Sequence, residues 1–168
     1  MKIAVIGYSG AGKSTLAAAL GARYGCVVQH LDKIHWTAGW KERDPAEEQV
    51  LMTEAMRNDT WVMDGNYPHL AFERRMEEAD LIVFFAFPRF ICFLQAFSRY
   101  RHYRGKTRNS MTEGCEEQFD WEFIRWILWD GRTRERRKLY HTVKQKHGDK
   151  MVVLKSRSDV RMFQKSLG

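Results

Sequence analysis

The most constraining feature of this sequence is a glycine-rich octapeptide close to its first residue. Residues 7–14 read GYSGAGKS, which satisfies the pattern G-x-x-x-x-G-K-[ST] at every fixed position. Glycines let a backbone wrap around phosphate oxygens with its N–H groups pointing inward, and a helix N-terminus favours the negative charge. The motif requires a strand before it and a helix after it. The apolar run 2–6 and the helix-forming run 13–24 meet that requirement, so a phosphate-binding loop is predicted.

Each residue type in this loop has an expected role. The charge of Lys13 is expected on the β- and γ-phosphates of ATP, and the Ser14 hydroxyl is expected on Mg²⁺. The predicted nucleotide-binding residues are Gly7, Ser9, Gly10, Ala11, Gly12, Lys13, Ser14 and Thr15.

Apolar runs and helix-forming runs alternate along the rest of the chain. Further strands are expected at 26–30, 60–63, 81–86 and 151–154. Helices are expected at 45–57, 70–79, 89–103 and 117–147, the last bent near Gly131, and a final helix after a cap at Ser158. Strands that are apolar on both faces indicate a covered parallel sheet. The expected fold class is α/β: a three-layer P-loop NTPase fold with a five-stranded parallel sheet, helices on both faces and a helical lid.

Length and composition indicate one cytoplasmic domain. A chain of 168 residues fits a single domain, 1–168, and no linker divides it. The three cysteines form no C-x-x-C pair, so neither a disulfide framework nor a zinc site is indicated. The apolar run at the N-terminus is too short for a signal peptide, and the stretch 81–97 is interrupted by Pro88-Arg89. No membrane partner is therefore expected.

The absence of other signatures narrows the class of P-loop protein. The sequence contains neither the Asn-Lys-x-Asp motif of GTPases nor an LSGGQ-like transporter signature. Short P-loop kinases remain, with a substrate-binding insertion expected at about 30–57 and an arginine-rich lid at about 99–137. Arginines and Mg²⁺ neutralise a transferring phosphoryl group. The catalytic candidates are Lys13, Asp32, Arg101, Arg104, Arg108 and Arg134.

Three short stretches carry a resemblance to a known family. Residues 31–36 (LDKIHW) with Trp40, residues 64–67 (DGNY) and residues 87–89 (FPR) resemble the bacterial DNA topology modulation proteins, the FlaR-like family. That family is similar to the adenylate-kinase-like P-loop kinases. The fold of that family implies phosphorylation of a small molecule or nucleotide. The name of the family implies an influence on DNA topology.

Polar and aromatic residues after the expected strands are the candidates for acceptor binding. Asp32 is expected to bind the acceptor or to take a proton from its hydroxyl. Asp64, in an Asp-Gly pair, is expected to help hold Mg²⁺ through water. The adenylate-kinase-like pattern continues with Pro-Arg, whereas Asn66 and Tyr67 follow here, so a nucleoside monophosphate acceptor is not assured. The predicted substrate-binding residues are Asp32, His35, Trp36, Asp64, Asn66 and Arg89, and the predicted metal-binding residues are Ser14 and Asp64.

The favoured function is ATP-dependent phosphoryl transfer to a small molecule, with a nucleotide or nucleoside as the favoured acceptor. A DNA-binding ATPase is the alternative, because residues 98–109 interleave arginines with tyrosines and the formal net charge is +7. No helix-turn-helix, zinc-finger or basic-zipper pattern supports it. A nucleotide-sensing protein that binds ATP without turnover is a third reading. The expected partners are thus ATP and a small acceptor, with nucleic acid less favoured.

Overall fold

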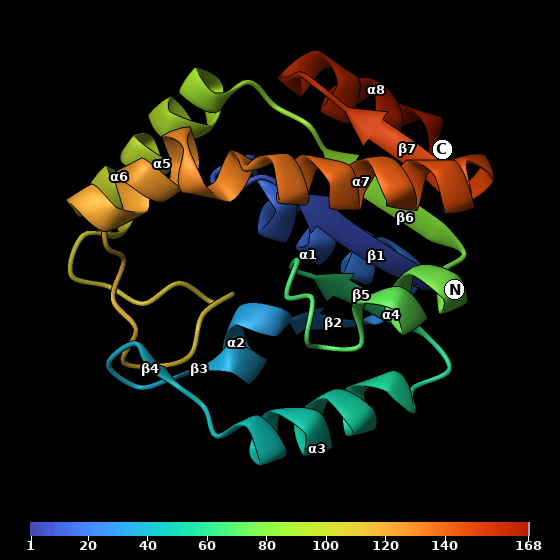
Figure 1. The fold of residues 1–168 in the computed structure, drawn as a ribbon, viewed down its shortest axis with the longest axis horizontal. Helices are drawn as coiled ribbons and strands as arrows, with labels where there is room; N and C mark the ends of the chain where they lie inside the picture. Colours follow the sequence, from blue (N-terminus) through green and yellow to red (C-terminus); the bar gives the residue numbers. More distant parts are fainter. Residues whose placement is uncertain (168) are drawn as a thin grey trace.

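A five-stranded parallel sheet forms the centre of the molecule (Figure 1). The computed structural model describes residues 1–167. The strands of the sheet are β1 (Lys2–Gly7), β2 (Val27–His30), β5 (Trp61–Asp64), β6 (Leu81–Phe85) and β7 (Met151–Leu154). Their order is β2-β5-β1-β6-β7. Because β1 is central and every neighbouring pair is parallel, the loop after β1 emerges in the middle of the sheet's carboxyl edge.

Helices cover both faces of this sheet. One face carries α1 (Lys13–Tyr24), α5 (Arg89–Tyr103), α6 (Trp121–Leu128) and α8 (Arg157–Ser166). The other carries α3 (Pro45–Met56), α4 (Phe72–Glu78) and α7 (Arg134–His147), and Figure 1 shows α3 at the bottom of the molecule and α7 across its upper half. Side chains alternate along β1, so that Ile3 and Val5 join the first core while Ala4 and Ile6 join the second. The predicted α/β class and three-layer arrangement are confirmed.

The segment between β2 and α3 contains structure that the sequence did not predict. It forms a short helix, α2 (Leu31–His35), and a two-stranded antiparallel hairpin, β3 (Trp36–Thr37) with β4 (Lys41–Glu42). The strands of this hairpin are too short to show an alternating pattern. Helix α3 then begins as expected, since the Asp44 side chain accepts hydrogen bonds from the backbone N–H groups of Ala46 and Glu47.

The expected single helix at 117–147 is wrong. Residues 117–120 are not helical, and two helices, α6 and α7, are separated by the 3₁₀ turn η1 (Asp130–Arg132). Each helix has its own cap: Asp120 accepts from the Phe123 N–H and Thr133 from the Arg136 N–H. The break lies at Gly131, where a Cβ atom would meet the carbonyl oxygen of Trp126 at 2.7 Å. The bend expected near Gly131 is therefore a complete interruption.

The cap of the last helix is also displaced from its predicted position. Ser156, not Ser158, caps α8: its hydroxyl accepts from the Asp159 N–H at 3.1 Å. Asp159 accepts in turn from the Ser156 N–H at 3.0 Å, which completes a capping box. A second 3₁₀ turn, η2 (Gly148–Lys150), leads into β7. Within residues 1–167, no helix combines the length and the apolar character needed to span a membrane.

Candidate functional site

The predicted phosphate loop lies between β1 and α1 and fits closely against its neighbours. The Tyr8 N–H donates to the carbonyl oxygen of Phe85 at 3.1 Å. Gly10 has φ +79°, and a Cβ atom there would lie 2.5 Å from the carbonyl oxygen of Cys92 on α5. Gly7 is equally confined, with a Cβ position 2.4 Å from the Phe85 carbonyl oxygen. The glycines are thus required by close backbone approach as well as by left-handed φ values.

Lys13, the first residue of α1, folds back over this loop. Its Nζ donates to the carbonyl oxygen of Tyr8 at 3.0 Å. Burial lowers the pKa of Lys13, while the charges of Asp64 and Asp32 oppose this shift. An ammonium held in partly dehydrated surroundings beside two carboxylates is suited to receive an anionic phosphate.

Asp64, the last residue of β5, brings a buried carboxylate to the same edge. Its Oδ2 lies 3.0 Å from Nδ1 of His30, at the end of β2. Its Oδ1 is buried and has no hydrogen-bond partner among the described residues. A buried carboxylate oxygen without a donor fits the oxygen coordination of Mg²⁺, and the half-buried Ser14 hydroxyl follows Lys13 in the chain. The free oxygen of Asp64 is therefore of the type that the predicted metal requires.

Asp32, on α2, is oriented by a residue that sequence reasoning did not single out. The Tyr67 hydroxyl donates to Oδ1 of Asp32 at 2.7 Å. Burial, together with the charge of Asp32, raises the pKa of Tyr67 far above its usual range. Tyr67 therefore stays a proton donor, and it leaves the second carboxylate oxygen of Asp32 for another partner. The stretch DGNY contains Tyr67, but only the fold brings it to Asp32.

Asn66 occupies a different place from the one expected. Its Oδ1 accepts from the Gly7 N–H and its Nδ2 donates to the Gly7 carbonyl oxygen, both at 2.9 Å. The amide therefore fastens the β5–α4 loop to the first residue of the phosphate loop. Arg89 is exposed at the start of α5 and has no polar partner within residues 1–167.

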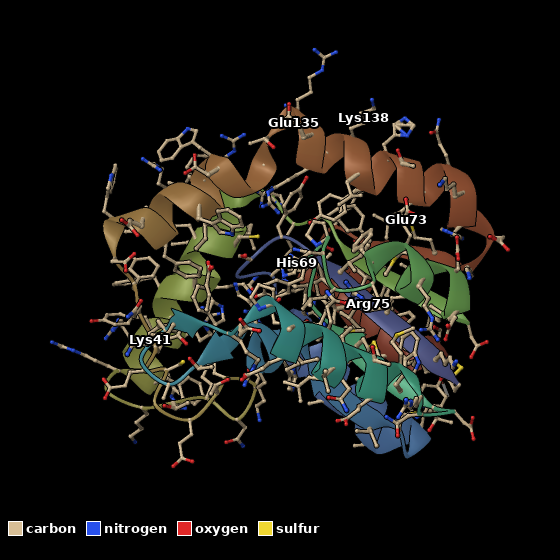
Figure 2. The ribbon with its side chains drawn as sticks, turned by 60° about the horizontal axis from the view of Figure 1, so that its bottom comes forward. Lys41, His69, Glu73, Arg75, Glu135 and Lys138 are labelled. Carbon is tan, nitrogen blue, oxygen red and sulfur yellow. The ribbon has the colours of Figure 1, made fainter. Side chains whose placement is uncertain are left out.

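The β5–α4 loop is held from below by Arg75, whose side chain is fully buried. The guanidinium donates to four carbonyl oxygens, those of Leu70, Gly65, Asn66 and Tyr67. Burial lowers the pKa of Arg75 below its usual range. Figure 2 shows Arg75 inside the molecule, close to the centre of the view. The sequence signal for this burial was the helical spacing, because Arg75 shares one face of α4 with the apolar residues Phe72 and Met76.

The predicted catalytic arginines are not brought together. Arg101, Arg104 and Arg134 are exposed. Arg108 turns inward, and its Nε lies 2.5 Å from Oε2 of the buried Glu117. Arg99, which was not among the candidates, donates from Nε to Oε1 of Glu117 at 2.6 Å.

Among these arginines, Arg99 interacts electrostatically with charged residues of the site. Burial and the charge of Arg108 lower its pKa, whereas Glu117 and Asp32 oppose the shift. Arg99 also acts on the pKa of Lys13. Helical spacing could have indicated it, because Cys92, Ala96 and Arg99 follow one another at i, i+4 and i+7.

A second arginine, Arg132, lies directly over the phosphate loop. Its guanidinium carbon is 3.7 Å from the centre of the Tyr8 ring, and it donates to the Phe87 carbonyl oxygen at 2.9 Å. The Trp126 indole N–H donates to the Ser9 hydroxyl at 3.1 Å. The α6–α7 corner thus covers the phosphate loop at Tyr8 and Ser9.

The segment after α5 also contacts the hairpin that follows α2. Thr112 donates to the Trp36 carbonyl oxygen at 2.6 Å, and the Gly39 N–H donates to the Gly114 carbonyl oxygen at 3.1 Å. The Trp40 indole N–H donates to the Glu116 carbonyl oxygen at 3.0 Å. The Trp36 ring packs edge-on against both Trp40 and His35, with centroids 5.6 Å and 4.6 Å away. The insertion and the expected lid therefore touch each other beside the site.

A groove of about 530 Å³ opens next to the phosphate loop. Residues from α5 and from the start of α8 line it: Pro88, Ile91, Leu94, Gln95, Ser98, Lys155, Ser156 and Arg157. Nε2 of Gln95 is buried without a partner in the described chain. Gln95 Oε1 lies 3.8 Å from the position of a Cβ atom on Gly12, which joins the groove to the loop.

Comparison with solved structures shows what this fold is similar to. Shikimate kinase from Acinetobacter baumannii in complex with shikimate has a TM-score of 0.60 and 18% sequence identity, over 99% of this chain and 90% of that chain. Deoxyadenosine kinase from M. mycoides with bound dATP has a TM-score of 0.50 and 14% identity, over 99% of both chains. This chain thus shares its fold with these two kinases. No protein-family model matches, nor does any curated protein, so the resemblance to the topology modulation family stays a prediction.

Proposed function

We propose that this protein transfers the γ-phosphoryl group of ATP to a small molecule, and that the favoured class of acceptor is a nucleoside or nucleotide. The observation that carries the proposal is the meeting of three elements at one edge of the sheet. They are a complete phosphate loop, a buried Asp64 oxygen without a partner, and Asp32 within electrostatic reach of Lys13. Phosphoryl transfer needs positioning and charge stabilisation more than covalent help from the protein, and these groups supply both.

The donor nucleotide is proposed to lie along α1 and α5. Its phosphates would be held by the N–H groups of residues 7–15 and by the Lys13 ammonium. Its base would enter the groove beside Gln95, whose amide N–H has no partner within residues 1–167 and could donate to it. Bound Mg²⁺, held by Ser14 and Asp64, would neutralise charge on the phosphates.

The acceptor is proposed to bind on the other side of the phosphate loop, under α2 and the hairpin. Asp32, fixed by Tyr67, would accept the proton of the attacking hydroxyl. The hydroxyl oxygen of the acceptor would bond to the γ-phosphorus of ATP as the bond to ADP breaks. Trp36 offers an aromatic face for a planar base. Shikimate and deoxyadenosine, after which the two similar kinases are named, are hydroxylated molecules, which is consistent with this class of acceptor.

Residues 30–57 are proposed to act as the acceptor-binding insertion and residues 99–137 as the lid. Arg99 and Arg132 replace the exposed Arg101, Arg104 and Arg134 as the arginines we expect to act in transfer. Arg132 already lies over Tyr8, and Arg99 is close enough to affect the pKa of Lys13. A closed lid would exclude water, so that transfer to the acceptor exceeds hydrolysis.

A DNA-binding ATPase remains the alternative, and the arrangement of the basic segment favours it less. Two of the arginines in residues 98–109, Arg99 and Arg108, are paired with Glu117. The arginines of this segment therefore do not form a continuous basic strip that faces solvent. Nucleic-acid binding through a basic surface would weaken steeply with salt. Binding to DNA that follows this salt dependence, with no acceptor-dependent ATP use, would favour the alternative.

The test is ADP release measured with ATP, Mg²⁺ and a panel of nucleosides, nucleoside monophosphates and small hydroxylated metabolites. We expect at least one acceptor to raise ADP release and to appear as a phosphorylated product. Lys13→Ala should abolish transfer with the circular dichroism spectrum unchanged, because the phosphate charge loses its partner. Arg134→Ala, at an exposed position, is the matched control and should retain most activity. Full transfer by folded Lys13→Ala would contradict the proposal.

A further inference from the structure

A second cluster of chemically active side chains lies outside the phosphate site. Glu48 on α3 is buried, with 3% of its surface exposed, and its two carboxylate oxygens face two histidines. Oε1 lies 2.6 Å from Nδ1 of His35, and Oε2 lies 3.2 Å from Nε2 of His69. These three residues come from three separate segments: α2, α3 and the β5–α4 loop. Figure 2 shows His69 near the middle of the molecule, beside α3.

The charge of this cluster is not balanced by a permanent cation. Within residues 1–167, no lysine or arginine pairs with the Glu48 side chain. Imidazoles carry a positive charge only on protonation, and ring nitrogens in their neutral form are metal ligands. A buried carboxylate is costly unless it is paired or coordinates a metal ion. Glu48 already lies within hydrogen-bond distance of His35, and a divalent cation between the three side chains would in addition neutralise its charge.

The geometry and the donor types suit zinc. The three ligand atoms all lie within 4.8 Å of one another. Ligand atoms around a tetrahedral zinc with bonds of about 2.1 Å are separated by roughly 3.4 Å, so the side chains need only small shifts. Two histidines and one glutamate form a donor set found in three-ligand zinc sites, with water as the fourth ligand. The His69 side chain is 50% exposed, which leaves a path for the ion and for that water.

A further carboxylate lies on the other side of the His35 ring, beyond hydrogen-bond distance. Oε1 of Glu42, on β4, lies 3.8 Å from Nε2 of His35, the ring nitrogen that does not face Glu48. Metal-binding histidines commonly present their second nitrogen to such a carboxylate, which fixes the tautomer and the ring orientation. His35 thus has Glu48 at Nδ1 and Glu42 near Nε2, and a small shift of the exposed Glu42 side chain would complete such a pair.

We infer that His35, Glu48 and His69 form a zinc-binding site that fastens the insertion to the β5–α4 loop. The His35 ring also packs against Tyr67, with centroids 4.8 Å apart, and Tyr67 donates to Asp32. Occupation of the site would thus hold the residue that orients Asp32. The inference concerns metal binding and stands independently of the proposed transfer activity.

The test is zinc binding by the metal-stripped full chain, measured by equilibrium dialysis in excess Mg²⁺, with Co²⁺ absorption spectra as the probe of coordination. We expect one equivalent of Zn²⁺ in the wild type and a visible Co²⁺ spectrum typical of four-coordinate nitrogen and oxygen ligands. Glu48→Gln and His69→Ala should lose that equivalent. His141→Ala, an exposed histidine on α7, should retain it.

A further variant separates this site from the proposed Mg²⁺ site. Asp64→Asn should bind zinc as the wild type does, because Asp64 lies outside the cluster. His69→Ala changes a half-exposed side chain, so it keeps the test valid if Glu48→Gln fails to fold. Absence of bound zinc in the wild type, or equal binding by wild type and folded His69→Ala, would overturn the inference.

Discussion

At the scale of single residues, Gly10 shows how tightly the phosphate loop is built into the fold. Its φ of +79° and the 2.5 Å approach of the Cys92 carbonyl oxygen both oppose a side chain. We expect Gly10→Ala to lower the free energy of unfolding by about 2–4 kcal/mol, the sum of left-handed strain and forced displacement. Urea denaturation measures this. The control is Gly105→Ala, with φ +68° and nothing within 4 Å, which should lose only about 1 kcal/mol. Equal losses would show that steric contact is unimportant.

Arg75 makes a second prediction at this scale, because an exposed arginine precedes it on the same helix. Arg75→Met would leave four loop carbonyl oxygens without their donor, and we expect a loss of about 3 kcal/mol or more. Arg74→Met removes only a surface pair with Glu78 and should cost less than about 1 kcal/mol. Thermal unfolding of the two variants side by side gives the comparison, and a smaller effect at Arg75 would refute its structural role.

The same residues show what a sequence can and cannot reveal about a site. The phosphate loop was predictable because its function depends on consecutive residues with fixed backbone requirements. Asn66 was expected at the substrate, yet both ends of its amide bond to Gly7. Tyr67 meets Asp32 across 35 positions of the chain, and no local pattern reports such a contact. Residues whose role comes from tertiary packing needed the structure.

At the scale of elements, local signals decided which predictions held. Helix α1 has the predicted bounds, since the phosphate motif fixes its start and Gly25 its end. The stretch 117–147 contains helix-forming residues throughout, so a continuous helix was a reasonable expectation. Two internal caps and the close approach at Gly131 divide it, and these depend on which side chains the turn brings together. Short elements such as β3 and β4 carry too few residues for a pattern.

The segment between α5 and α6 depends on one buried carboxylate, that of Glu117. The carboxylate pairs with Arg99 and Arg108. The backbone N–H of Glu117 donates to the Lys106 carbonyl oxygen at 3.1 Å. Glu117→Gln would leave two like charges close together, so we expect about 2 kcal/mol of lost stability, below the cost of breaking a fully buried pair. Hydrogen exchange at residues 105–117 should accelerate. Glu116→Gln, its exposed neighbour, should leave exchange unchanged, and equal behaviour of the two variants would contradict this role.

At the scale of the whole molecule, the site lies where the carboxyl edge of the sheet meets the insertion and residues 99–137. The sheet and its two cores hold the phosphate loop, Asp64 and Lys13 in place. The insertion and residues 99–137 meet above them through hydrogen bonds such as those of Thr112 and Trp40. The Trp40 hydrogen bond is exposed to solvent, and exposed hydrogen bonds are typical of parts that open at low energetic cost. The arrangement is therefore suited to closure around bound molecules.

Closure predicts a specific pattern of hydrogen exchange. ATP, Mg²⁺ and an accepted substrate together should slow exchange in residues 99–137 and in residues 30–44, because Arg99, Arg132 and the hairpin would close over the phosphates. The C-terminal end of α4, residues 76–78, is the internal reference, since Glu78 pairs there with Lys2 at the amino end of β1. Its exchange should not change. Lys13→Ala should show no protection under the same conditions, because it lacks the charge that holds the nucleotide. Protection confined to residues 7–15 would show that ATP binds without closure, and the lid assignment would then be wrong.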